Sequence, residues 1–105
     1  MSLESKRCTP CEGGTPKLLE DQARALLAEV PGWDLVDDRL RRRFVFPTFV
    51  EAMRFVNAMA KIAEEEGHHP DFTVHYREVG VVLWTHALSG LSENDFILAA
   101  KISRL

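Results

Sequence analysis

The chain passes from a helical pattern to a strand pattern within Glu64-Glu65-Glu66-Gly67-His68-His69-Pro70-Asp71-Phe72-Thr73-Val74-His75-Tyr76. Three of the four histidines lie in this stretch, and the fourth is His86. Gly67 readily adopts the left-handed conformation that ends many helices. Pro70 disfavours the α region for His69 and so pushes that residue into extended geometry. We therefore expect two adjacent imidazoles to be presented at a helix-to-strand junction.

The residues before the junction predict a long central helix over about Phe49 to Glu66. Thr48 and Glu51 have the spacing of a capping box, which marks the helix start. Apolar residues recur at helical spacing in the order Phe49, Ala52, Met53, Phe55, Val56, Met59, Ala60, Ile62 and Ala63. This stripe is broad, so we expect it to pack against a sheet and against a second surface, such as another subunit.

The residues after the junction predict two strands, at Phe72–Arg77 and at Val81–Ala87, joined by a turn near residues 78–80. The second of these strands is apolar on both faces, which is typical of an interior strand. If the two strands pair as a hairpin, His86 near the end of one lies close to His69 at the start of the other.

The remaining segments complete a regular order of elements. A helix is predicted over Lys17–Val30, a hairpin over residues 33–46, and a last helix after the capping box Ser92-Glu93-Asn94-Asp95. The order α-β-β-α-β-β-α predicts an α+β fold, with a four-stranded antiparallel sheet and helices packed on one face. Residues 1–16 are expected to form an irregular N-terminal arm and residues 17–105 a single domain.

The composition is that of one globular domain: 105 residues, 46% hydrophobic and 28% charged, with a net charge of −3. The negative charge argues against a dedicated nucleic-acid binder. No apolar run has the ~20 residues that span a bilayer, and no secretory signal is visible. A cytoplasmic protein without membrane partners is expected.

Two local motifs admit a functional interpretation that we do not favour. Cys8 and Cys11 form a lone Cys-x-x-Cys, but a structural zinc site needs about four ligands, so we expect a reduced, mobile leader. Arg39, Arg41 and Arg43 share one strand face and invite a phosphate-binding hypothesis. A solvated strand face is the simpler interpretation, because charge on an outer strand also discourages aggregation.

The histidines suggest proton transfer. The C-terminus of a helix favours a nearby protonated imidazole, and Glu64, one turn before His68, would add to this if the side chains meet. His68, His69 and His86 are expected to converge on a pocket that holds a proton donor and a proton acceptor together. The alternatives are ordinary polar residues at strand ends and a zinc or iron site, but the spacing matches no metal motif that we can identify.

At these residues the chain resembles the pterin-4a-carbinolamine dehydratases. The resemblance consists of Glu64, three residues, His68-His69-Pro70, five residues, Tyr76, nine residues, His86, eight residues and Asp95. It extends to Pro31-Gly32-Trp33, Gly90-Leu91, Asp95-Phe96 and Ala99-Ala100, and to the cysteine-containing leader, and so covers nearly the whole chain.

The resemblance implies a hydro-lyase, 4a-hydroxytetrahydrobiopterin dehydratase, that converts 4a-hydroxytetrahydropterin to quinonoid dihydropterin and water without metal or cofactor. It implies that His68 and His86 are the acid and base, that His69 binds and polarises the substrate, and that Glu64 and Asp95 orient imidazoles. It places substrate contacts at His68, His69, Pro70, Thr85, His86, Ala87 and Leu88. We expect Trp33 or Phe72 to supply an apolar wall for the pterin ring.

The resemblance also implies partners. The reaction would recycle the cofactor of aromatic amino acid hydroxylases, so phenylalanine hydroxylase is a possible functional partner, and a homodimer or homotetramer is expected. The alternative is an oligomerisation, assembly or transcription-coactivator scaffold with little catalytic activity. The complete histidine set argues against a purely degenerate member.

Overall fold

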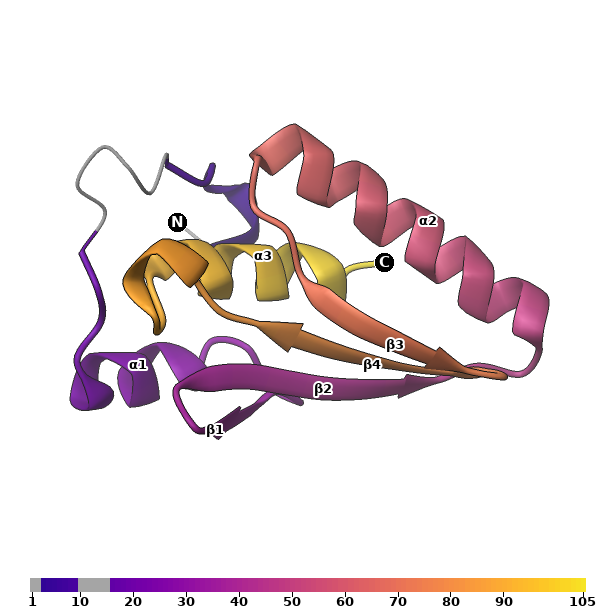
Figure 1. Cartoon of the computed structure of the whole chain (residues 1–105), viewed down its shortest axis with the longest axis horizontal. Coiled ribbons are helices and arrows are strands. Elements are labelled where there is room, and N and C mark those ends of the chain that lie inside the picture. The colour runs from indigo at the N-terminus through magenta and orange to yellow at the C-terminus, as the bar shows by residue number, and fades with distance from the viewer. Residues whose placement is uncertain (1–2, 10–15) are drawn as a thin grey trace.

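The computed structural model describes residues 3–9 and 16–105 (Figure 1). The helices and strands are α1 (Glu20–Leu27), β1 (Asp34–Val36), β2 (Arg39–Val45), α2 (Phe49–Glu66), β3 (Asp71–His75), β4 (Glu78–Leu83) and α3 (Glu93–Ser103). Single 3₁₀ turns lie at Leu3–Ser5 and His86–Leu88. In the part of the chain that the structure describes, no helix is long and apolar enough to cross a membrane.

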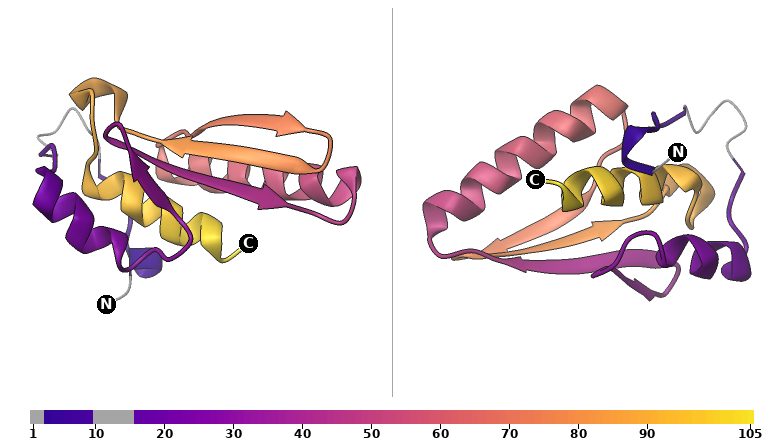
Figure 2. Two further views of the ribbon diagram at one scale, coloured as in Figure 1. Left: turned by 90° about the horizontal axis from the view of Figure 1, so that it is seen from below. Right: turned by 180° about the vertical axis from the view of Figure 1, so that it is seen from behind.

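The four strands form one antiparallel sheet in the order β1-β2-β4-β3. In the β3–β4 hairpin, Asp71 pairs with Val82 and His75 with Glu78. Figure 2 shows α2 and α3 on the same side of this sheet. The predicted α+β fold is therefore confirmed, and β4 is the interior strand that its sequence indicated.

Alternation along β4 separates a covered face of the sheet from an open one. Val79, Val81 and Leu83 are almost fully buried beneath the helices, whereas Gly80 and Val82 face the other way. Helix α3 is buried on nearly all sides, because it lies among the sheet, α2 and the N-terminal segment. The core is thus shared by the sheet and α3, and the open face of the sheet carries Arg39, Arg41 and Arg43 of β2.

The predicted fourth strand was wrong by three residues at its start and by four at its end. The pairing of His75 with Glu78 leaves only Tyr76 and Arg77 as the turn, with Tyr76 at φ 55°. The turn predicted near residues 78–80 is wrong, because these residues lie within β4, with Gly80 beside Thr73. His86 consequently belongs to the 3₁₀ turn beyond the strand.

Helix α1 is also shorter than the helix expected over Lys17–Val30, because it begins at Glu20 and ends at Leu27. By contrast, the prediction for α2 is confirmed at both ends. Thr48 accepts a hydrogen bond from the backbone N–H of Glu51, and Gly67 adopts φ 67° directly after the helix.

The N-terminal segment is packed where the structure describes it. Leu3 is 4% exposed and joins the core, and Cys8 is half-buried. A mobile leader is therefore the wrong description of residues 3–9. Cys11 lies outside the described residues, so the Cys-x-x-Cys motif as a whole is not described.

Candidate active site

The end of α2 points two neighbouring histidines in different directions. The left-handed Gly67 turns the chain, and the N–H groups of both Gly67 and His68 bond back to the carbonyl of Ala63. His68 is directed inward and is 7% exposed. The side chain of His69 lies at the surface and is 61% exposed. Glycine and proline thus separate two imidazoles that are adjacent in sequence.

His68 forms a buried pair with Asp95, which opens α3. The distance from His68 Nε2 to Asp95 Oδ1 is 2.6 Å, and Asp95 is fully buried. The other carboxylate oxygen, Oδ2, accepts hydrogen bonds from the Thr85 hydroxyl at 2.8 Å and from the Ser92 backbone N–H at 3.0 Å. Because Thr85 donates to Asp95, the Ser92 hydroxyl donates to Thr85, at 2.8 Å.

This network selects one tautomer of His68. An ionised carboxylate only accepts hydrogen bonds, so the proton in the bond to Asp95 belongs to His68 Nε2. In a neutral ring, Nδ1 is then the unprotonated nitrogen, and it is available as a proton acceptor. Asp95 therefore caps a helix and also fixes the chemistry of an imidazole.

Glu64 contacts His69 and not His68, so it does not act on His68 in the way considered from the sequence. The Glu64 Oε2 to His69 Nε2 distance is 2.5 Å, at the exposed end of α2. The turn at Gly67 explains why Glu64 pairs with His69. It sends His68 inward to Asp95 and leaves His69 beside the last helical turn.

His86 is held from the open side of the sheet. Its ring lies 4.0 Å from the Trp84 ring, and its Nε2 lies 3.6 Å from Asp71 Oδ2. The same oxygen accepts a 2.8 Å hydrogen bond from the Trp84 indole N–H, and the Arg39 guanidinium lies 4.2 Å from the Trp84 ring centre. His86 therefore has an aromatic neighbour and an acidic one.

The three histidines border one pocket of about 210 Å³. Its lining residues are Gly67, His68, His69, Trp84, Thr85, His86 and Ala87. This volume lies below the ~300–1,000 Å³ typical of sites for drug-sized ligands, so it suits a small ring system. The structure thus brings together His68, His69, Thr85, His86 and Ala87, whereas Pro70 and Leu88 are not in the lining.

The expected aromatic wall was assigned to the wrong residues. Trp33 is 4% exposed, packs edge-on against Phe44, and donates its indole N–H to Ser103. Phe72 lies on β3 and lines a different hollow. Trp84 is the aromatic side chain at the pocket. Its place two residues before His86, on the same face of an alternating segment, is the sequence signal that could have identified it.

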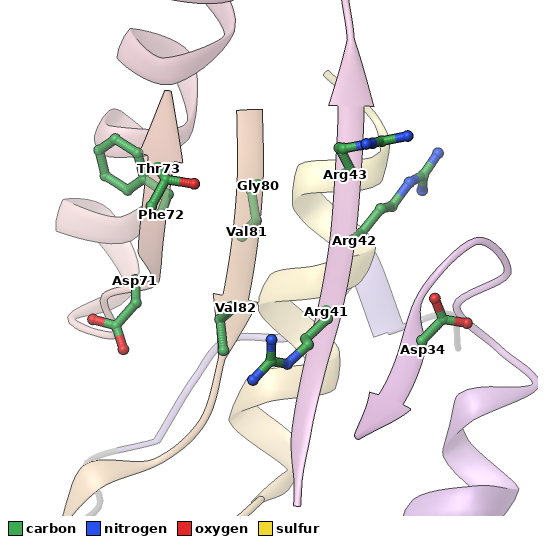
Figure 3. A pocket seen from close by; sticks show the side chains of 10 residues that line it. All are labelled: Asp34, Arg41, Arg42, Arg43, Asp71, Phe72, Thr73, Gly80, Val81 and Val82. Carbon is green, nitrogen blue, oxygen red and sulfur yellow. The ribbon is translucent and has the colours of Figure 1, made fainter. Parts of the chain in front are cut away.

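The second hollow, of about 480 Å³, lies on the open face of the sheet and contains none of the histidines (Figure 3). Arg43 pairs with Glu78 at 3.3 Å, and Arg42 bonds to Ser103. The Arg41 side chain points toward Val82 in Figure 3. Asp71 borders this hollow and also contacts His86, so the two regions adjoin.

Within residues 3–9 and 16–105, no three histidine, cysteine or acidic side chains are arranged to hold one metal ion. The polar groups around the pocket are instead committed to carboxylate–imidazole pairs. These pairs are His68 with Asp95, His69 with Glu64, and His86 with Asp71.

Fold and site together define a small α+β protein with histidines gathered around a pocket at the end of an antiparallel hairpin. The family model for pterin 4 alpha carbinolamine dehydratase matches residues 16–105. The chain belongs to this family. The expected family is therefore confirmed.

Relatives extend over almost the whole chain. A provisionally named pterin-4-alpha-carbinolamine dehydratase of Dechloromonas aromatica is 49% identical, covering 99% of this chain and 93% of the relative. A protein of Nitrosomonas eutropha with the same provisional name is 47% identical, covering 98% of this chain and 92% of the relative.

Two solved structures share the fold. A transcriptional coactivator/pterin dehydratase from Brucella melitensis is 33% identical with a TM-score of 0.82, covering 85% of this chain and 97% of its own. A pterin dehydratase-like protein identified as a RuBisCO assembly factor in the alpha-carboxysome is 25% identical with a TM-score of 0.58, covering 69% and 83%.

Proposed function

We propose that this protein dehydrates 4a-hydroxytetrahydropterin to quinonoid dihydropterin and water, as a 4a-hydroxytetrahydrobiopterin dehydratase. The observation that carries the proposal is the arrangement of three imidazoles, each with its own carboxylate, around one small pocket. Loss of water from a carbinolamine needs a proton delivered to the departing hydroxyl and a proton removed from the adjacent ring nitrogen. One site must therefore hold an acid and a base together.

The carboxylate partners of the two imidazoles suggest how the two roles divide. His68, with Nε2 committed to Asp95, acts as the base through Nδ1 and takes the proton from the ring nitrogen. His86, with Asp71 as the ion-pair partner of its protonated ring, acts as the acid and gives its proton to the hydroxyl, which leaves as water. The electrons of the broken N–H bond form the new double bond as the C–O bond breaks.

His69 and Trp84 are assigned to substrate binding. The exposed His69, oriented by Glu64, polarises an edge of the pterin ring, and Trp84 offers a flat apolar surface next to His86. Ala87 supplies backbone groups at the pocket edge, which suits a ring bordered by donors and acceptors. Thr85 lines the pocket, and its backbone N–H and carbonyl are bonded to Gly90. Pro70 and Leu88 are assigned to the pocket margins.

The cellular setting is part of the same proposal. The reaction returns the oxidised cofactor of aromatic amino acid hydroxylases, so phenylalanine hydroxylase is the functional partner we propose, in the cytoplasm. A homodimer or homotetramer is supported by exposed apolar side chains at the start of α2, where Phe49 is 49% and Val50 is 57% exposed.

The test is a stopped-flow measurement of the absorbance change when chemically generated 4a-hydroxytetrahydropterin meets the recombinant protein. We expect acceleration over buffer, and a loss of about 10²–10⁴-fold on replacing either His68 or His86 with alanine. His69→Ala should raise KM more than it lowers kcat. His75→Ala is the matched control, because His75 is an exposed histidine on β3 that does not line the pocket.

The second candidate is a scaffold with little catalysis. It is favoured by the exposed apolar start of α2 and by the similarity to the RuBisCO assembly factor. No acceleration by the folded wild-type protein would support this candidate over the enzyme.

A further inference from the structure

The N-terminal segment Leu3–Thr9 runs between the C-terminal end of α2 and helix α3, in indigo in Figures 1 and 2. Leu3 is buried in the core, and Lys101 of α3 donates a 2.9 Å hydrogen bond to the carbonyl of Glu4. These two contacts anchor the beginning of the segment. Its last three residues, Arg7–Thr9, reach the two chain segments that carry His68 and Asp95.

The first of these contacts is made at Glu66, two residues before His68. The Glu66 side chain is only 5% exposed, and it accepts a 2.8 Å hydrogen bond from the backbone N–H of Cys8. Arg7 Nε lies 2.9 Å and Lys101 Nζ 3.7 Å from the carboxylate. Burial favours the neutral acid, but the Cys8 hydrogen bond and the two cations outweigh it and lower the pKa of Glu66.

The second contact is made at Asn94, directly before Asp95. Asn94 is 1% exposed, and its side-chain amide exchanges two hydrogen bonds with the backbone of Thr9. The Thr9 N–H donates to Asn94 Oδ1 at 2.9 Å, and Asn94 Nδ2 donates to the Thr9 carbonyl at 2.7 Å. Both hydrogen-bonding groups of the amide are thus used to hold one backbone unit.

Cys8 fits between the two contacts. Its sulfur lies 3.7 Å from the carbonyl oxygen of Asn94. Burial, together with the nearby Glu66 carboxylate, raises the pKa of Cys8 to about 12, so the thiol is neutral at physiological pH. A neutral thiol can sit against a carbonyl and donate weakly to it.

The pair that these contacts flank needs positioning from outside. His68 and Asp95 lie 27 residues apart and belong to separate segments. His68 follows Gly67, which has no side chain to restrain the turn, and a Cβ built there would meet nothing within 4 Å. The geometry of the His68–Asp95 hydrogen bond therefore depends on what fixes the ends of α2 and α3 relative to each other.

We propose that Arg7–Thr9 act as a clasp that positions the His68–Asp95 pair, with Glu66 and Asn94 as positioning residues for the reaction. The clasp binds Glu66, two residues before His68, and Asn94, one residue before Asp95, and none of its residues lines the pocket. Its kinetic consequence rests on the proposed dehydratase function, whereas its effect on the hydrogen bond does not.

The test compares Asn94→Ala with the control Lys6→Ala. Asn94→Ala removes both hydrogen bonds to Thr9. Lys6→Ala removes the 3.0 Å ion pair from the same segment to Glu93, and it leaves the clasp intact. Proton NMR reports the Nε2–H of His68 in its 2.6 Å hydrogen bond, assigned by its loss in His68→Ala. Stopped-flow kinetics report kcat and KM.

We expect Asn94→Ala to shift or broaden the His68 signal and to lower kcat about tenfold or more, because small misplacements of a catalytic group are costly. KM should change much less, and Lys6→Ala should leave the NMR signal, kcat and KM unchanged. A folded Asn94→Ala protein with a wild-type His68 signal overturns the proposal. So does an equal effect of Lys6→Ala.

Two further outcomes are also decisive. If Asn94→Ala does not fold, Thr9→Pro removes the Thr9 N–H donor from the segment itself. The His68 NMR signal, kcat and KM of Thr9→Pro then test the proposal in the same way. If the wild-type protein shows no dehydration, the proposed function fails, but the NMR signal still tells whether the clasp positions the pair.

Discussion

Asp95 divides its two carboxylate oxygens between a helix cap and a histidine. Oδ2 accepts the backbone N–H of Ser92, as a capping-box acid does, and Oδ1 meets His68. Both roles are compatible with the sequence, and the structure gives each of them its own carboxylate oxygen. A substitution at Asp95 should therefore affect stability and chemistry separately.

We expect Asp95→Asn to lower kcat by about 10²–10⁴-fold, because an amide that donates to His68 reverses the tautomer and removes the base at Nδ1. Stability should fall by about 1–3 kcal/mol, since the buried amide pairs less well with Thr85 and Ser92. Stopped-flow kinetics and urea denaturation measure the two effects. Asp34→Asn, at an exposed acid on β1, is the control. A folded variant with wild-type kcat would contradict the assigned tautomer.

Trp84 should contribute to binding more than to proton transfer. Replacing it with alanine removes the aromatic surface beside His86, so we expect KM to rise about tenfold, in line with the ~0.5–1.5 kcal/mol of an aromatic contact and some lost apolar burial. Trp84→Phe keeps a ring and loses only the N–H bond to Asp71, and its KM should rise less. Phe72→Ala, at an exposed aromatic outside the pocket, should leave KM unchanged. Equal effects of Trp84→Ala and Phe72→Ala would argue against this wall.

Single residues were predictable where local backbone chemistry decides their conformation. Gly67 and Pro70 turn the chain, so the presentation of His68 and His69 at a helix-to-strand junction followed from sequence. The partner of Glu64 did not, because it depends on which imidazole turns inward, and the buried Asp95 that draws His68 inward lies 27 residues away.

At the scale of elements, the end of α2 makes the clearest prediction. Gly67 has φ 67°, and a Cβ there would meet no atom within 4 Å, so Gly67→Ala costs only backbone strain. We expect a loss of about 1 kcal/mol in the free energy of unfolding, measured by urea denaturation. Gly67→Asn should cost less, because asparagine tolerates the left-handed region. An unchanged free energy of unfolding in Gly67→Ala would show that the helix end does not require this conformation.

The elements also show where sequence patterns stop being informative. Helix α2 was predicted to the residue because an N-cap threonine and a C-terminal glycine mark its ends. The predicted start of β4 is three residues too late, because glycine is common in turns and Gly80 directly precedes the predicted strand. A type of turn that leaves Tyr76 at positive φ carries no strong sequence signal. Tertiary pairing with β2 and β3 decided the register.

At the scale of the whole molecule, Glu66 joins the N-terminal segment to α2 and makes folding sensitive to acid. Its folded pKa is lowered, so its stabilisation is fully present above its ordinary value of about 4.5 and is lost as the pH falls through the folded value. We expect Glu66→Gln to destabilise the protein by about 1–3 kcal/mol at pH 7 and by much less near pH 3. Denaturation at several pH values measures this difference. Glu65→Gln, at its exposed neighbour, should show no such trend, and a pH-independent cost at Glu66 would contradict the role of its charge.

Exposed apolar side chains gather at the start of α2. Val45, Phe49 and Val50 are 61%, 49% and 57% exposed, and Phe46 and Leu105 border an adjacent hollow of about 340 Å³. Apolar side chains grouped in this way mark association sites on soluble proteins. We therefore expect light scattering to show a dimer or larger assembly, and Phe49→Lys to dissociate it, because a charge buried in an interface is costly.

Phe72→Lys is the control for this surface, since Phe72 is 44% exposed but lies on the edge strand β3. Dissociation by Phe72→Lys and not by Phe49→Lys would show that the interface lies at the sheet edge instead. A monomeric wild-type protein would show that the chain forms no such interface. The position of the interface also matters for catalysis. The candidate pocket is lined by residues 67–69 and 84–87, none of which belongs to the apolar surface at the start of α2. A dissociated Phe49→Lys protein should therefore keep its dehydration rate, so that loss of assembly and loss of chemistry can be told apart.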